Sequence, residues 1–90
     1  MRTAREKLED NISVDAEDII LIDDVDYCDA LIGTTHDDRA VYDIDLMAKE
    51  LMEKEGLSED DAFDHIEFNI IRSLPYIKGK SPIIIYPFKM

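Results

Sequence analysis

Tryptophan is absent from this chain, and cysteine occurs once, at Cys28. A single cysteine cannot close an internal disulfide and excludes CxxC and Cys/His zinc patterns, which suits a reducing cytosol. No apolar run approaches the roughly 20 residues of a membrane span, and the first ten residues are charged rather than apolar. The sequence also has no internal repeat, linker or low-complexity tract. We therefore expect a soluble, cytoplasmic protein that does not associate with membranes.

Basic residues are also missing from a long part of the chain. The 31 residues between Lys7 and Arg39 contain no Lys or Arg, but they contain eleven carboxylates. The other 59 residues hold eleven acids and ten bases. The eleven carboxylates are Glu9, Asp10, Asp15, Glu17, Asp18, Asp23, Asp24, Asp26, Asp29, Asp37 and Asp38. Such a field steers encounters with partners and affects solubility, but it does not specify packing. Because phosphate binding needs a basic surface, the net charge of −12 argues against nucleic acid as a direct ligand.

The length and the apolar content predict one small folded domain, residues 1–90. An apolar fraction of 46% is high enough for the chain to fold despite its charge. Sequence patterns predict helices over residues 2–9, 43–55 and 58–74, and strands over residues 18–23, 29–33, 39–42 and 82–86. Whether the acidic N-terminal residues 1–28 are ordered or disordered is left open.

The two longer helices have clear boundary signals. Asp43 or Asp45 is suited to accept hydrogen bonds from the free amides at a helix start, and Gly56 is suited to the left-handed stop. Ser58 begins the next helix, and Pro75 fits its end because the residue before a proline avoids helical dihedrals. Apolar residues recur at helical spacing in the first of these helices: Ile44, Met47, Ala48, Leu51 and Met52.

Segregated strands and helices are typical of an α+β fold. We expect a small antiparallel sheet of three to four strands, covered on one face by two antiparallel helices. Residues 29–33 and 39–42 form its hairpin, joined by a polar five-residue connection. The last strand contains Pro82 and is followed by Pro87. A strand with prolines lies at an edge of the sheet, or the prolines lie at the ends of the strand.

A set of short motifs resembles a family of small uncharacterised proteins of phages and prophages. The motifs are Asp29-Ala30-Leu31-Ile32-Gly33, Val41-Tyr42-Asp43, Gly56-Leu57-Ser58-Glu59-Asp60-Asp61-Ala62, Glu67-Phe68-Asn69 and Pro82-Ile83. The resemblance implies an accessory protein of a virus or mobile element, and it implies no catalytic residues. Separately, the composition is similar to that of anti-restriction and anti-CRISPR proteins that imitate nucleic acid.

No combination of residues points to catalysis or to a bound metal. Asp24 to Asp29 alternates oxygen ligands as a calcium loop does, but Asp29 replaces the glycine at the sixth position, and the twelfth residue is Thr35 rather than Glu. His36 is a turn residue with no third member of a triad. His65 is a surface histidine among acids. We therefore expect no enzyme activity, no metal and no other cofactor.

The acidic residues have two interpretations. In the first, they form a solvated face that keeps a small protein soluble. In the second, they imitate phosphates: Asp24 and Asp26 on one side of an extended segment would lie about 6.6 to 7 Å apart, close to the spacing of successive phosphates. A basic groove of a nucleic-acid-binding protein would then accept the acidic face. Interleaved apolar residues predict that the segment is partly folded, which lowers the entropy lost on binding.

Phe68 and Ile71 form a second candidate surface, because they lie roughly opposite the apolar stripe of the helix over residues 58–74. They are either buried against another element or exposed as a dimer seam or partner anchor.

The sequence thus predicts a phage-type inhibitor that binds a host nucleic-acid-binding protein, such as a CRISPR or restriction effector. The alternative is a non-catalytic adaptor or homodimeric structural protein that uses the Phe68 and Ile71 face. The candidate partner-binding residues are Asp15, Glu17, Asp18, Asp23, Asp24, Asp26, Asp29, Asp37, Asp38, Phe68 and Ile71.

Overall fold

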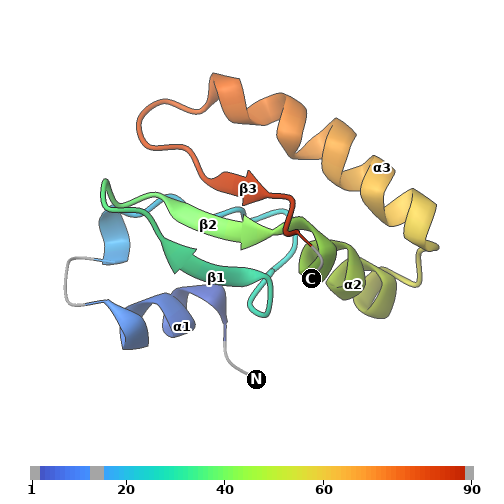
Figure 1. The fold of residues 1–90 in the computed structure, drawn as a ribbon, viewed down its shortest axis with the longest axis horizontal. Helices are drawn as coiled ribbons and strands as arrows, with labels where there is room; N and C mark the ends of the chain where they lie inside the picture. The colour runs from blue at the N-terminus through green and yellow to red at the C-terminus, as the bar shows by residue number, and fades with distance from the viewer. Residues whose placement is uncertain (1–2, 13–15, 89–90) are drawn as a thin grey trace.

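The computed structural model describes residues 3–12 and 16–88, which form an α+β fold as expected (Figure 1). The elements, in chain order, are α1 (Ala4–Asn11), the 3₁₀ helix η1 (Ala16–Asp18), β1 (Leu31–Thr34), β2 (Ala40–Asp43), α2 (Ile44–Glu55), α3 (Glu59–Asn69), the 3₁₀ helix η2 (Ile71–Tyr76) and β3 (Ile83–Ile85). Within the described residues, no helix is both long enough and apolar enough to cross a bilayer.

The sheet has the order β1-β2-β3 and is mixed rather than antiparallel. β1 and β2 form the predicted antiparallel hairpin, but β3 pairs with β2 in parallel. The prediction of a wholly antiparallel sheet is therefore wrong at β3. The reason lies in the connection: α2 continues away from the end of β2, and α3 and η2 run back to the end where β2 begins (Figure 1). β3 is an edge strand, as its flanking prolines predict.

Side-chain caps explain where the helices begin. The Thr3 hydroxyl accepts a hydrogen bond from the Glu6 amide, and the Glu6 carboxylate accepts one from the Thr3 amide. The Asp43 carboxylate accepts hydrogen bonds from the amides of Asp45 and Leu46, so α2 follows β2 directly. The Ser58 hydroxyl caps α3.

One predicted boundary and one predicted element need correction. α2 ends before Gly56, which has φ 68° as expected, but α3 ends at Asn69 and η2 occupies the rest of the predicted helix. Pro75 explains the tighter turn, because its ring excludes an α-helical hydrogen bond and disfavours α dihedrals at Leu74. The strand predicted over residues 18–23 is not formed: η1 ends at Asp18 and the residues after it are irregular.

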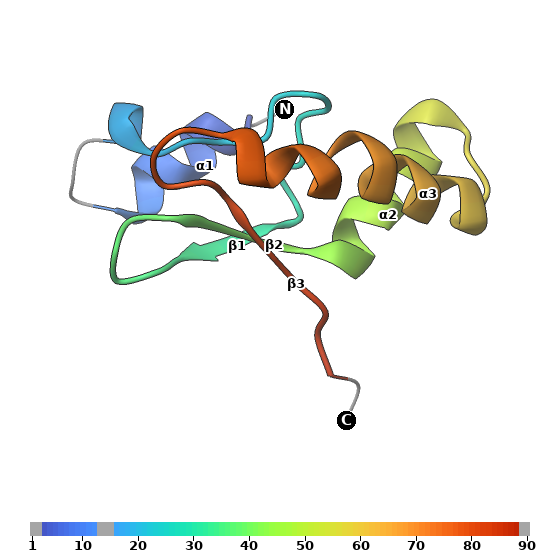
Figure 2. The ribbon, with the colours of Figure 1, turned by 90° about the horizontal axis from the view of Figure 1, so that it is seen from above.

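The core lies between the sheet and a layer of helices on one side of it. Tyr42 and Ala40 on β2 are fully buried, as are Met47 and Leu51 on α2 and Ile66 on α3. Figure 2 shows α1 and α3 on the same side of the sheet, and none of the described helices lies on the other side. Met52, which was expected in the apolar stripe of α2, is 37% exposed.

Candidate functional site

Residues 16–29, here called the acidic segment, are fixed to the folded body through their backbone. The Arg5 guanidinium donates to the Ile19 carbonyl oxygen at 3.1 Å, and the Lys7 ammonium donates to the Cys28 carbonyl oxygen at 2.8 Å. From α2, the Lys54 ammonium donates to the Asp26 carbonyl oxygen at 2.5 Å. These three cations therefore hold the backbone of the acidic segment in place.

Tyrosine hydroxyls and buried apolar side chains complete this attachment. The Ile22 amide donates to the Tyr42 hydroxyl at 3.1 Å, and Ile19 is 2% exposed. Tyr27 is fully buried and packs edge-on against Tyr42, with ring centroids 6.3 Å apart. Burial raises the pKa of Tyr42 to about 12. It also raises the pKa of Tyr27, and the nearby Asp24 carboxylate adds to that increase. Both phenols therefore stay neutral at physiological pH.

Two of the predicted partner-binding carboxylates are used inside the protein. Asp24 Oδ2 lies 2.7 Å from His65 Nε2, which links the acidic segment to α3. Asp26 Oδ1 accepts a hydrogen bond from the Ala4 amide at 2.9 Å, at the start of α1, where a negative charge is favourable. The idea that Asp24 and Asp26 extend side by side as a phosphate ladder is wrong, because each has its own internal partner and no strand forms there.

The six described carboxylates of the acidic segment are all exposed, but they differ in their partners. They are Glu17, Asp18, Asp23, Asp24, Asp26 and Asp29. Among the residues that the structure describes, Asp18, Asp23 and Asp29 have no ion pair. Asp15 lies outside the described residues. Among the described residues, Asp18, Asp23 and Asp29 are therefore the exposed carboxylates of this segment that have neither an ion pair nor a side-chain hydrogen bond.

Asp37 and Asp38 belong to the hairpin between β1 and β2, not to the acidic segment. The Thr35 hydroxyl donates to the Asp37 carboxylate, and this bond lowers the pKa of Asp37. Asp38 has a left-handed backbone with φ 63°, and its carboxylate lies 4.0 Å from the Lys80 ammonium. The predicted acidic face therefore draws its residues from two parts of the chain, the acidic segment and the hairpin.

Phe68 and Ile71 do not form a common exposed surface. The Phe68 side chain is 56% exposed, with the Arg72 guanidinium 4.4 Å from its ring centroid. Ile71 is half-buried and packs against the core. Of these two residues, only Phe68 has a largely exposed side chain that could contact a partner.

Glu50 is a structural residue that sequence reasoning missed. It is 4% exposed, and its Oε1 accepts a hydrogen bond from the Ala30 amide at 2.8 Å. Its Oε2 lies 3.3 Å from the Lys54 ammonium, which also binds the acidic segment. In the sequence, the only signal of this structural role is that Glu50 and Lys54 are four residues apart. Exposed ion pairs on helices have the same spacing, so the signal does not predict burial. The burial of Glu50 arises only because the turn before β1 packs against α2.

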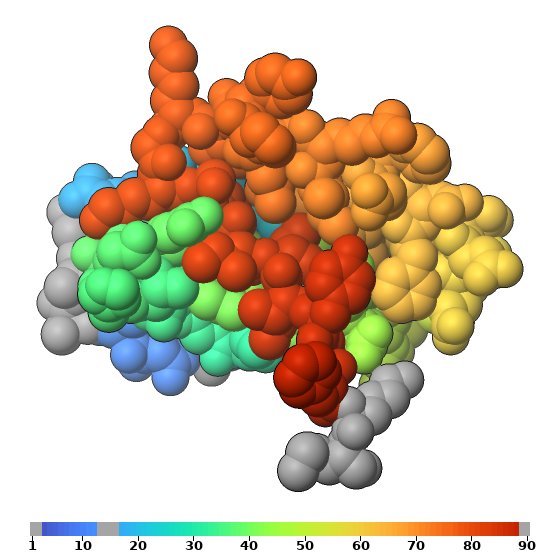
Figure 3. Space-filling model, turned by 45° about the horizontal axis from the view of Figure 1, so that its top comes forward, coloured from blue at the N-terminus to red at the C-terminus, as the bar shows by residue number. Residues whose placement is uncertain are grey.

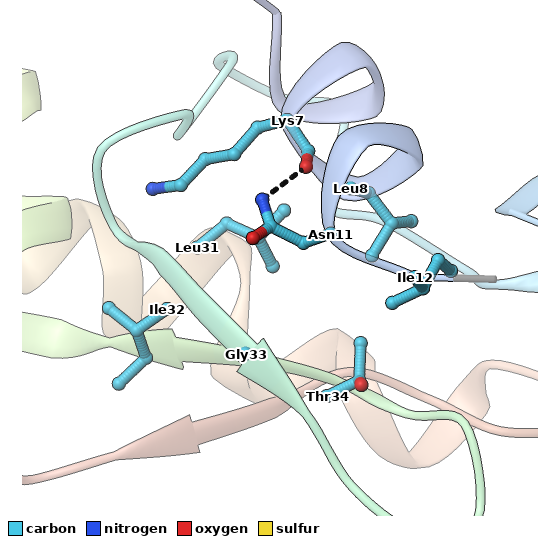
Figure 4. Close-up of a pocket in the computed structure, with 8 residues that line it drawn as sticks. All are labelled: Lys7, Leu8, Asn11, Ile12, Leu31, Ile32, Gly33 and Thr34. Carbon is cyan, nitrogen blue, oxygen red and sulfur yellow. Dashed lines mark hydrogen bonds between the residues drawn. The ribbon is translucent and has the colours of Figure 1, made fainter.

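A small groove lies between α1 and β1 (Figure 4). Its volume is about 210 Å³, below the roughly 300 Å³ at which small-molecule pockets begin. Two of its three polar side chains already have partners: the Asn11 amide donates to the Lys7 carbonyl oxygen, and the Lys7 ammonium donates to the Cys28 carbonyl oxygen. The groove therefore does not present the converging polar groups of an active site.

Metal and thiol chemistry have equally little support among the residues described. No group of three or more His, Cys, Asp or Glu side chains there is placed to hold a metal ion. Burial raises the pKa of the Cys28 thiol, with smaller contributions in the same direction from Asp26 and Asp29, so Lys7 does not make it a reactive thiolate.

Comparisons with protein-family models, with curated proteins and with solved structures find no significant match to this chain. The similarity to small phage proteins therefore stays a prediction, and the functional argument depends on geometry and charge.

Proposed function

We propose that this chain is a non-catalytic binding protein that docks its acidic segment on a basic, nucleic-acid-binding surface of a host protein in the cytoplasm. In this role it acts as a phage-type inhibitor that occupies the surface in place of DNA or RNA. Nucleic acid itself is not the ligand, because a net charge of −12 repels phosphates.

One observation supports this proposal above all others. The cations around the acidic segment, Arg5, Lys7 and Lys54, donate to its backbone carbonyl oxygens. Asp18, Asp23 and Asp29 are thereby held in an ordered segment without an ion pair of their own among the described residues. Fixed, uncompensated charges lose less entropy on binding and accelerate encounters with a basic partner.

The test compares two variants with the same net charge. Asp18→Asn, Asp23→Asn and Asp29→Asn together remove three exposed carboxylates from the acidic segment. The control replaces exposed acids of α2 and α3 by amides: Glu53→Gln, Asp60→Asn and Glu67→Gln. None of these six side chains has a hydrogen bond or ion pair among the described residues that would confound the comparison.

Each protein is immobilised and exposed to bacterial DNA-binding proteins that heparin retains. We expect the wild type and the control to bind a member of this fraction and to block its binding to DNA. The first variant should bind at least about tenfold more weakly and show a shallower salt dependence, because fewer charges meet the partner. An equal loss of affinity in both variants would indicate that net charge alone determines binding. If the first variant binds as tightly as the wild type, the acidic segment does not dock on the partner.

The adaptor alternative that uses Phe68 and Ile71 has less support, because Ile71 packs against the core. An exposed apolar surface does exist on this molecule, but it lies on the sheet.

A further inference from the structure

The last strand has an apolar sequence on both faces but is covered on only one. Ile83, Ile84 and Ile85 form a continuous apolar run, which is typical of strands buried on both sides. Ile84 pairs with Tyr42 and packs against the core. Its neighbours Ile83 and Ile85 pair with Val41 and Asp43, so they lie on the opposite face of the sheet. No described helix covers that face (Figure 2).

This face, here called the open face, comprises Val41, Ile83 and Ile85, and the chain that follows β3 beside it carries Tyr86 and Phe88. The three aliphatic residues are partly exposed, while Tyr86 is 64% and Phe88 is 95% exposed. The chain after β3 extends away from the sheet on the side without helices (Figure 2). In the space-filling view, this part of the chain (red) protrudes from the surface (Figure 3). Large exposed apolar patches of this kind mark interaction sites.

The charge around the open face decides which partner it fits. Residues 77–88, which lead into β3 and follow it, contain no Asp or Glu, but they contain Lys78 and Lys80. Asp43 shares the open face, but its carboxylate accepts hydrogen bonds from the amides at the start of α2. Two copies of a chain with a net charge of −12 repel each other over most of their surfaces. The acid-free C-terminal part is where two copies can approach with the least repulsion.

We propose that the open face is a homodimer interface, on which a second copy of this chain docks its own open face about a twofold axis. In such an arrangement each patch is buried against its own equivalent. Aromatic side chains bury about 150 to 250 Å² each, so at the observed exposures Tyr86 and Phe88 offer about 240 to 400 Å² per copy. Counted on both copies, the two aromatic residues contribute about 480 to 800 Å², and with the aliphatic residues the upper end of this range reaches roughly 1,000 Å², the lower limit for a specific association.

The proposal predicts how salt affects the dimer. Salt screens the repulsion between two acidic copies while leaving apolar burial intact, so dimerisation should strengthen as salt is raised from about 0.1 M to about 1 M. Docking of the acidic segment on a basic partner has the opposite salt dependence. The two proposals are therefore independent, and failure of one leaves the other intact.

The experiment is sedimentation equilibrium of the full chain, from low micromolar to several hundred micromolar, at both salt concentrations. The test variant is Tyr86→Ser with Phe88→Ser. Its control is Phe68→Ser with Tyr76→Ser, since these aromatic residues are 56% and 86% exposed but lie on α3 and η2. All four side chains are largely exposed, so neither variant should unfold, and circular dichroism verifies this.

We expect the wild type and the control to dimerise alike, more strongly in high salt, and the test variant to dimerise at least about tenfold more weakly. Amides of Ile83 to Ile85 in the wild type should also exchange more slowly as the protein concentration rises. A wild type that stays monomeric at every concentration and both salts would overturn the proposal, leaving the open face to a different partner. It would equally be overturned by a dimer that survives in the test variant.

Discussion

Replacing Glu50 by alanine should destabilise the protein more than any substitution of an exposed acid. Glu50 is 4% exposed, and its carboxylate accepts the Ala30 amide hydrogen bond, with Ala30 itself fully buried. A hydrogen bond to a charged group contributes about 1.5 to 3 kcal/mol, and a buried amide left without an acceptor costs a similar amount. The ion pair with Lys54 adds less than about 1 kcal/mol, because the lysine side chain is 36% exposed and therefore screened.

We expect Glu50→Ala to lower the free energy of unfolding by about 3 kcal/mol. A domain of this size has a total of only roughly 5 to 13 kcal/mol, so the loss is a large fraction. At about 4 to 8 °C per kcal/mol, the melting temperature should fall by about 12 to 24 °C. Glu50→Gln keeps an oxygen acceptor for the Ala30 amide and should cost only about 1 kcal/mol.

The measurement is urea unfolding followed by circular dichroism, with a check that the m-value is unchanged. Glu53→Ala, an exposed acid on the same helix, is the control and should change stability by no more than about 0.5 kcal/mol. If Glu50→Ala and Glu50→Gln have equal effects, the Ala30 hydrogen bond does not contribute as proposed. If Glu50→Ala matches the Glu53 control, the buried Glu50 carboxylate does not stabilise the turn before β1.

Two further predictions concern pH and divalent cations. Because burial raises the pKa of Tyr42 from 10.0 to about 12, its contribution to stability is complete below pH 10 and is lost as the pH rises towards 12. Tyr42→Phe should roughly halve the loss in the free energy of unfolding between pH 10 and 12, as measured by urea unfolding, because ionisation of Tyr27 causes the rest. An unchanged dependence of the free energy of unfolding on pH would contradict this. Millimolar Ca²⁺ or Mg²⁺ should raise the melting temperature no more than monovalent salt at matched ionic strength, whereas saturable binding in calorimetry would reveal a true metal site.

The sequence alone determined the features that depend on neighbours along the chain. The start of α2 is set by the Asp43 side chain and its end by Gly56, and both signals are local, since a cap acts within one turn. The β1 and β2 hairpin is likewise set by a short polar connection. Pro82 and Pro87, which lack an amide proton, restricted the last strand to an edge of the sheet or to the stretch between them, and β3 is an edge strand. These local rules are also why the α+β class was predictable.

Only the tertiary structure decided what the acidic residues do. By sequence, Asp23, Asp24 and Asp26 are equivalent acids of one segment. In the fold, Asp24 meets His65 of α3 and Asp26 meets the start of α1, while Asp23 stays exposed. The apolar run Ile19 to Ile22 was compatible with a strand by pattern, but without a neighbouring strand its backbone binds side chains instead, including Arg5 and Tyr42.

The direction of β3 and the open face were also beyond the sequence. Whether β3 runs parallel or antiparallel to β2 depends on the end of the sheet at which the chain returns, and that follows from the path of α3 and η2 through space. The run Ile83 to Ile85 indicated burial on both faces, yet only the packing of the helices on one side shows which face is left uncovered. Local interactions set the elements, whereas contacts between residues distant in the chain set which of their surfaces remain for a partner.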